Sequence, residues 1–106
     1  MTKMNKRAIN TYEDLPKWGI LFLEMISNIK KGVITIITPE GKYLKYSGIK
    51  EGEEVTIRIN DWRFCEELFL KGDIGLGESY ISGYWDCENI NKLIQLGVEN
   101  YKELDR

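Results

Sequence analysis

The chain has 106 residues, of which 42% are apolar and 30% are charged, and its formal net charge is −2. This length suits one compact domain, and the composition is that of an ordinary globular protein. A nearly neutral balance predicts no polyanionic partner, so nucleic-acid binding is not expected. Because histidine is absent, neither a Ser–His–Asp triad nor a Cys–His pair can form. A metal site would need carboxylates or the two cysteines, and no clustering of either suggests one, so no metal and no cofactor are predicted.

Residues 1–12 are polar and aperiodic and are expected to form a disordered tail, followed by a single domain over residues 13–106. The most apolar run, Trp18–Ile29, is too short to cross a bilayer of roughly 30 Å, and no secretory signal is recognised. Cys65 and Cys87 lack CxxC spacing and are expected to be free thiols. The expected location is therefore the cytoplasm.

A first helix is predicted for Glu13–Ile29, because apolar side chains recur there at helical spacing: Trp18, Phe22, Met25, Ile26 and Ile29. This stripe is expected to pack on a sheet, with a membrane surface or a partner's groove as the alternatives. Gly32 is expected to close the helix as its C-cap.

Strands are predicted in the middle of the chain. Val33–Ile37 and Lys42–Tyr46 flank a Pro-Gly turn at Thr38–Gly41, which indicates a hairpin. After a polar loop over Ser47–Glu54, alternating apolar residues predict a half-buried third strand whose inner side is formed by Val55, Ile57 and Ile59.

Helices are predicted to complete the domain. Asn60 or Asp61 would cap a helix that ends at Gly72 and carries one apolar face, formed by Trp62, Cys65, Leu68 and Phe69. Asp86 would cap the last helix, one side of which is marked by Ile90, Leu93, Ile94 and Gly97. This order predicts an α+β fold, in which a small antiparallel sheet (the hairpin plus a third strand) packs against several helices.

The stretch Gly72–Asp86 reads GDIGLGESYISGYWD and at first sight looks like the glycine-rich loop of a nucleotide site. Such a loop requires a buried strand directly before it, but Glu66–Lys71 has the pattern of a helix. Tyr80 also stands where the third glycine of the fingerprint belongs. A nucleotide site is therefore not expected here.

The same glycines are instead expected to turn the chain into a short second helix that Gly83 ends, after which Tyr84 and Trp85 return to the core. Glu78 has two interpretations: a hydrogen-bond partner for backbone amides at a turn, or an acid near a helix N-terminus that the helix dipole favours. A lone carboxylate does not make an acid–base site.

Two motifs together resemble the N-terminal domain of bacterial cyclopropane-fatty-acyl-phospholipid synthases, the group that includes the mycolic acid cyclopropane synthases. The first is the hairpin Gly32–Gly41, which matches G-x-L/I-x-I/V-x-x-P-x-G. The second is Gly72–Trp85, which matches G-D-I/L-G-L-G/A-E-A/S-Y-x-x-G-x-W. The resemblance covers roughly Ile29 to Asn100. The element order is also similar, more weakly, to sterol carrier protein type 2.

This resemblance implies a non-catalytic domain. The full enzyme transfers a methylene carbon from S-adenosylmethionine to a double bond of a phospholipid acyl chain. Its cofactor loop and catalytic residues lie in a C-terminal methyltransferase domain that this chain lacks, so no catalytic residue is carried over. The implied partners are a methyltransferase domain or subunit and a phospholipid or membrane surface, with peripheral attachment to the inner membrane as one location.

Three hypotheses follow. The chain is a free-standing or truncated lipid-engaging or docking domain of such a synthase, an independent lipid-binding module of the sterol-carrier type, or a decayed fragment without function. The docking hypothesis predicts an apolar patch that stays exposed, formed by one face of the last helix and by contact residues in the glycine-rich stretch. Those contact residues are Glu78, Tyr80, Tyr84 and Trp85.

Overall fold

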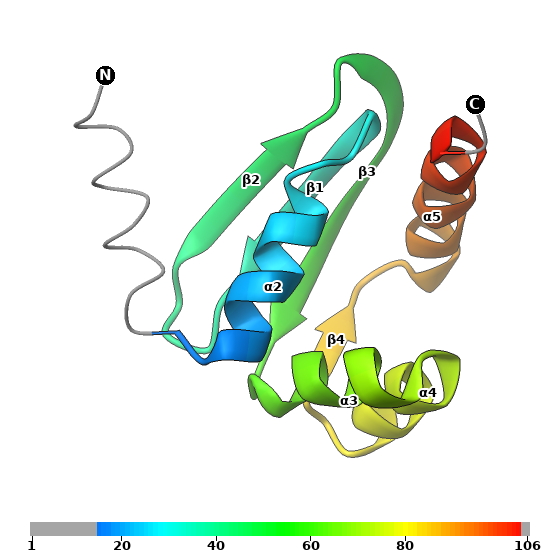
Figure 1. The fold of residues 1–106 in the computed structure, drawn as a ribbon. Coiled ribbons are helices and arrows are strands. Elements are labelled where there is room, and N and C mark those ends of the chain that lie inside the picture. Colours follow the sequence, from blue (N-terminus) through cyan, green and yellow to red (C-terminus); the bar gives the residue numbers. More distant parts are fainter. Residues whose placement is uncertain (1–14, 105–106) are drawn as a thin grey trace.

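The computed structural model describes residues 15–104, so the expected tail over residues 1–12 lies outside the described part, as do Glu13 and Asp14 of the first predicted helix. The described helices are α2 (Lys17–Ile26), α3 (Arg63–Lys71), α4 (Asp73–Ile81) and α5 (Ile90–Leu104). The strands are β1 (Lys31–Ile37), β2 (Tyr43–Ser47), β3 (Lys50–Ile59) and β4 (Trp85–Cys87). This arrangement confirms the predicted α+β class (Figure 1).

The four strands form one sheet in the order β2-β1-β3-β4. The hairpin of β1 and β2 is antiparallel, as predicted, and places Ile36 opposite Leu44. The expectation of a purely antiparallel sheet is corrected, because β1 and β3 run parallel, with Ile36 also beside Ile57. The short strand β4 adds an antiparallel edge to β3 and was not predicted.

The parallel pair arises from the connection between β2 and β3, which passes over the start of β1. The Gly48 amide donates to the Gly32 carbonyl at 2.8 Å, and the Lys50 amide donates to the Lys30 carbonyl at 3.0 Å. A Cβ at Gly48 would collide with the backbone of Lys30, so only glycine permits this close approach. The predicted polar loop over Ser47–Glu54 is accordingly a short turn followed by the first half of β3.

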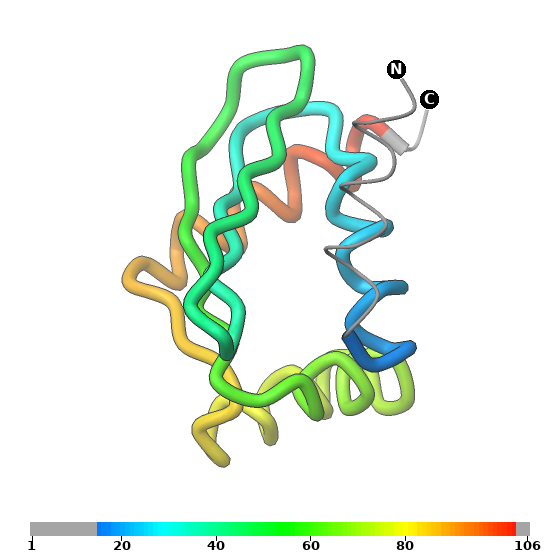
Figure 2. Tube along the Cα trace, turned by 90° about the vertical axis from the view of Figure 1, so that its left-hand side faces the viewer, coloured from blue at the N-terminus to red at the C-terminus, as the bar shows by residue number. Residues whose placement is uncertain are grey.

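The hydrophobic core lies on one face of the sheet. Apolar side chains from all four strands point to that face, and the helices supply Phe22, Leu23, Phe64, Cys65 and Leu96. In Figure 2 the sheet and α2 stand on opposite sides of the domain, and α3 and α4 close one end. The other face of the sheet carries exposed side chains, among them Tyr43, Lys45, Thr56 and Arg58.

Two predicted caps have other roles. Gly32 has φ +83° and lies inside β1, at an irregularity of the pairing with β3, so it does not end α2. A Cβ there would come within 2.5 Å of both the Glu53 carbonyl oxygen and the Leu96 side chain. Asp86 belongs to β4, and the cap of α5 is Asn89, whose Oδ1 accepts from the Lys92 amide at 3.1 Å.

Gly72 is the C-cap of α3, as predicted, and it is also the N-cap of α4. It ends α3, donating its amide to the Leu68 carbonyl at 2.8 Å, and it also begins α4, accepting from the Leu76 amide at 2.9 Å. Its φ of +59° lets the chain fold one helix back against the other. The predicted short second helix is therefore confirmed as α4.

Candidate functional site

The glycine-rich stretch forms a helix rather than a ligand-binding loop. Gly75 and Gly77 lie inside α4, and Gly75 is buried where α4 crosses α3. A Cβ at Gly75 would collide with the Glu67 carbonyl, whereas a Cβ at Gly77 would meet nothing within 4 Å. Gly75 therefore allows α3 and α4 to pack closely together.

The four predicted contact residues fall into different environments. Trp85 is 5% exposed and donates its indole N–H to the Leu76 carbonyl at 3.0 Å, so its ring belongs to the core. Tyr80 is 44% exposed and lies against Trp85, with ring centroids 5.1 Å apart. Of these two aromatics, only Tyr80 has a substantially exposed ring.

Tyr84 and Glu78 meet at a shallow hollow of about 370 Å³ beside α3 and α4. The guanidinium carbon of Arg63 lies 4.9 Å from the centre of the Tyr84 ring. The hydrogen bonds from Arg63 lower the pKa of the Asp61 carboxyl, to which Arg63 is paired at 2.8 Å. This hollow brings together two of the four predicted residues.

Glu78 is held by a lysine rather than by backbone amides. Its carboxylate lies 3.2 Å from the Lys71 ammonium, which also lies 3.2 Å from Glu67. Hydrogen bonds to Glu67 and Glu78 raise the pKa of Lys71. Exposed ion pairs of this kind contribute little to stability, so this cluster is a surface feature of the α3–α4 pair.

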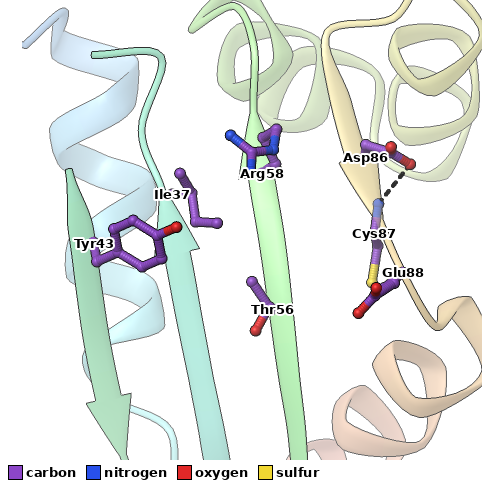
Figure 3. Close-up of a pocket in the computed structure, with 7 residues that line it drawn as sticks. All are labelled: Ile37, Tyr43, Thr56, Arg58, Asp86, Cys87 and Glu88. Atoms are coloured by element: carbon purple, nitrogen blue, oxygen red, sulfur yellow. Dashed lines mark hydrogen bonds between the residues drawn. The ribbon is translucent and has the colours of Figure 1, made fainter. Parts of the chain in front are cut away.

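A second hollow, of about 410 Å³, lies on the uncovered face of the sheet (Figure 3). Its charged side chains are Arg58, Asp86 and Glu88, and Tyr43 forms the opposite wall. Burial raises the pKa of the Cys87 thiol, which keeps it protonated and disfavours a nucleophilic role. Within residues 15–104, no cluster of three or more cysteine or carboxylate side chains could hold a metal ion.

A third, largely apolar hollow is a groove of about 470 Å³ between α2 and α5, over β1. Its floor is Ile34, its α2 wall carries Met25, Ile26 and Ile29, and its α5 wall is formed by Leu93, Leu96, Gly97 and Tyr101. Apolar pockets of about 300–1,000 Å³ are typical ligand sites. This α2–α5 groove is the candidate functional site.

Polar groups lie at one end of the α2–α5 groove. Asn100 of α5 bonds the backbone of Lys30 and Lys31, where the chain passes from α2 into β1. Among the described residues that line the groove, only Lys30 is charged. An apolar trough with a cation at its end suits an amphiphile with an anionic headgroup.

The sequence pattern indicated the α2 wall but assigned it to the core. Met25 is 47% exposed and Ile29 is half-buried, because α2 contacts the sheet mainly through Phe22 and Leu23, which are buried. On α5, Leu96 is buried while Ile94 is 58% exposed. The side of α5 that faces the sheet is therefore rotated away from the side that the sequence pattern marked. The signal for the groove was an apolar pattern wider than one packed face.

Fold and groove together define a small α+β domain with a surface groove that is lined mainly by apolar side chains. The chain is similar to the cyclopropane-fatty-acyl-phospholipid synthases of Escherichia coli strain K12 and of Escherichia coli O6:H1 strain CFT073. Each is 35% identical over 48 residues, which is 42% of this chain and 13% of the relative.

These relatives are much longer than the matched segment, because the chain covers only 13% of their length. No family model matches the sequence, and no solved structure matches it. None of the described helices is long and apolar enough to span a membrane.

Proposed function

We propose that this chain is a non-catalytic, lipid-engaging domain of the kind that accompanies a cyclopropane-fatty-acyl-phospholipid synthase. The observation that carries the proposal is the α2–α5 groove, whose walls are apolar and whose one lining charge is Lys30. The similarity to part of two such synthases supports the connection to this enzyme class. In this role the groove takes an acyl chain and Lys30 lies near the phosphate of the headgroup.

A catalytic role has no support in the described residues. Glu78 and Asp86 line separate hollows, and Glu78 is paired with Lys71. Burial raises the pKa values of both thiols, so neither cysteine is activated as a nucleophile. The chemistry would therefore belong to a methyltransferase domain or subunit, onto which this domain docks through the side that carries Tyr80 and Tyr84.

Lipid binding is tested by flotation with vesicles of phosphatidylethanolamine and phosphatidylglycerol. We expect the wild-type chain to float and Met25→Lys to lose at least tenfold in the bound fraction, because it places a charge at the wall of the groove. Ile81→Lys is the matched control, since Ile81 is 85% exposed on α4, away from the groove. Wild-type protein that neither floats nor yields lipid on organic extraction would contradict the proposal.

Docking is tested with an Escherichia coli synthase from which the matched 48-residue segment has been removed. We expect this chain, added in trans, to bind the truncated enzyme and to raise its methylene transfer, and Tyr80→Ala with Tyr84→Ala to weaken both effects. If lipid binding persists without docking, the second candidate function, an independent lipid-binding module, is favoured. The groove alone supports that alternative, because it needs no partner.

A further inference from the structure

The apolar side of α5 is wider than the surface that the core covers. Leu93 and Leu96 pack toward the sheet, but four more large apolar side chains of this helix stay exposed: Ile90 at 37%, Ile94 at 58%, Val98 at 42% and Tyr101 at 68%. At about 100° per residue, the helix is apolar over roughly 200°, whereas a single packed face needs little more than about 100°.

These four exposed residues, which we call the α5 stripe, follow each other at spacings of four, four and three positions. That spacing places them along one line of the helix, as in the seam between two packed helices. The polar residues of α5 that border the stripe on its outer side are Asn91, Gln95 and Lys102. The stripe therefore has the shape of a helix-packing surface without a helix on it in the described chain.

Gly97 lies at the midpoint of α5 and next to the stripe. A glycine inside a helix is less stabilising than alanine, and here a Cβ would meet nothing within 4 Å. The packing of the chain itself therefore gives no reason for the missing side chain. A glycine at this position lets a second helix approach α5 closely.

We propose that two copies of this chain associate through the α5 stripe, with their α5 helices antiparallel and crossing at Gly97. A two-fold axis at the midpoint of the helix places Ile94 of one copy against Val98 and Tyr101 of the other. The stripe is thus complementary to itself, which is the requirement for an isologous dimer.

Charge also favours a second copy. The stripe contains no charged side chain, and in the antiparallel pair Lys102 comes opposite Asn91 of the other copy rather than opposite a like charge. A membrane surface fits α5 less well, because its charged residues balance: Lys92 and Lys102 against Glu99 and Glu103. Interfacial helices are typically rich in Lys and Arg on their polar side.

The surface area of the α5 stripe determines how tightly the two copies are expected to associate. Four partly exposed side chains per copy cover less than the roughly 800 Å² per partner of a standard interface. We therefore expect a reversible dimer with a dissociation constant on the order of 10 µM. Ile90, Ile94 and Val98 lie outside the groove, whereas Tyr101 and Gly97 also line it. A substitution at Ile94 therefore tests the association separately from lipid binding.

Sedimentation equilibrium on the full chain, from about 1 to 500 µM, tests the association. We expect a monomer–dimer equilibrium whose dissociation constant rises at least tenfold in Ile94→Lys. Ile81→Lys is the matched control, because it makes the same change at a more exposed isoleucine and is expected to dimerise like the wild type. A wild-type chain that stays monomeric, or a dimer that Ile94→Lys leaves intact, overturns the proposal.

Disulfide trapping tests the antiparallel geometry. Gly97→Cys places two thiols near the proposed two-fold axis, and we expect oxidation to give a covalent dimer. The wild-type chain is the control, because Cys65 and Cys87 are buried and should not cross-link. A dimer in which Gly97→Cys fails to cross-link, or a stripe that binds only a helix of the synthase, would overturn the pairing of two copies.

Discussion

Asn100 of α5 makes a two-sided contact with Lys31 at the start of β1. Its Oδ1 accepts from the Lys31 amide at 3.1 Å, and its Nδ2 donates to the Lys31 carbonyl at 3.0 Å. The same Oδ1 accepts from the Lys30 amide at 2.7 Å. One side chain of the last helix therefore satisfies backbone groups 69 and 70 positions earlier in the chain, and it does so at one end of the α2–α5 groove.

We expect Asn100→Ala to destabilise the fold by about 1–3 kcal/mol, because it leaves backbone donors without their partner. Asn91→Ala, at an exposed asparagine of the same helix, is the control and should change the free energy of unfolding by less than about 0.5 kcal/mol. Urea unfolding of both variants measures the difference. Equal stabilities would show that water replaces the side chain at no cost.

The two glycines inside α4 predict opposite effects of the same substitution. Gly75→Ala should destabilise by about 1–3 kcal/mol or more, since the new methyl group would push α4 away from the Glu67 carbonyl of α3. Gly77→Ala should stabilise by about 0.5–1 kcal/mol, because its Cβ meets nothing within 4 Å. Thermal unfolding compares them, and two shifts of the same sign would contradict the α3–α4 packing.

Trp85 is expected to act through the core. Trp85→Phe keeps an aromatic ring beside Phe64 and Tyr80 but removes the indole N–H that bonds the Leu76 carbonyl. The Leu76 carbonyl keeps the Ser79 hydroxyl as a donor at 3.0 Å, so we expect a loss of about 1–3 kcal/mol from the missing hydrogen bond and the smaller ring. Tyr43→Phe, at a residue that is 69% exposed, is the control. If Trp85→Phe instead weakens docking at unchanged stability, the indole is a contact residue.

Much of the fold could be predicted from local patterns. The hairpin, the α3–α4 pair and the inner face of β3 follow from turn residues and apolar periodicity, which act over a few positions. The parallel pairing of β1 with β3 could not be predicted, because it depends on Gly48 passing over Lys30. Strand β4 was missed because its three residues are too few to show a period.

The candidate site was harder to predict for a different reason. Periodicity shows which helix residues are apolar, but it does not show how far each helix is rotated toward the sheet. Met25 was therefore grouped with the stripe that packs on the sheet, although it is 47% exposed. Ile94 was placed on the same side of its helix as Leu93, although only Leu93 packs against the core. The groove exists because α2 and α5 each keep part of an apolar face away from the sheet.

The Cys65 thiol should make the fold sensitive to alkaline pH. Burial raises the pKa of this thiol from its usual 9.0 to about 12. Above pH 9 the unfolded chain loses this proton while the folded chain keeps it, so the stabilising contribution of the neutral thiol declines from pH 9 toward pH 12. The expected slope is about 1.4 kcal/mol per pH unit in that window, and there is no change below pH 9.

Cys65→Ala isolates this effect from the titration of lysines and tyrosines, which the variant retains. At pH 8 the variant should be less stable than the wild type by about 1–2 kcal/mol, because a small buried side chain is removed. We expect that difference to shrink or reverse by pH 10.5, since the variant carries no thiol at this position to ionise on unfolding. Urea midpoints at pH 8, 9, 10 and 10.5 measure it. Parallel pH profiles for the two proteins would mean that the thiol ionises as easily in the folded chain as in the unfolded one.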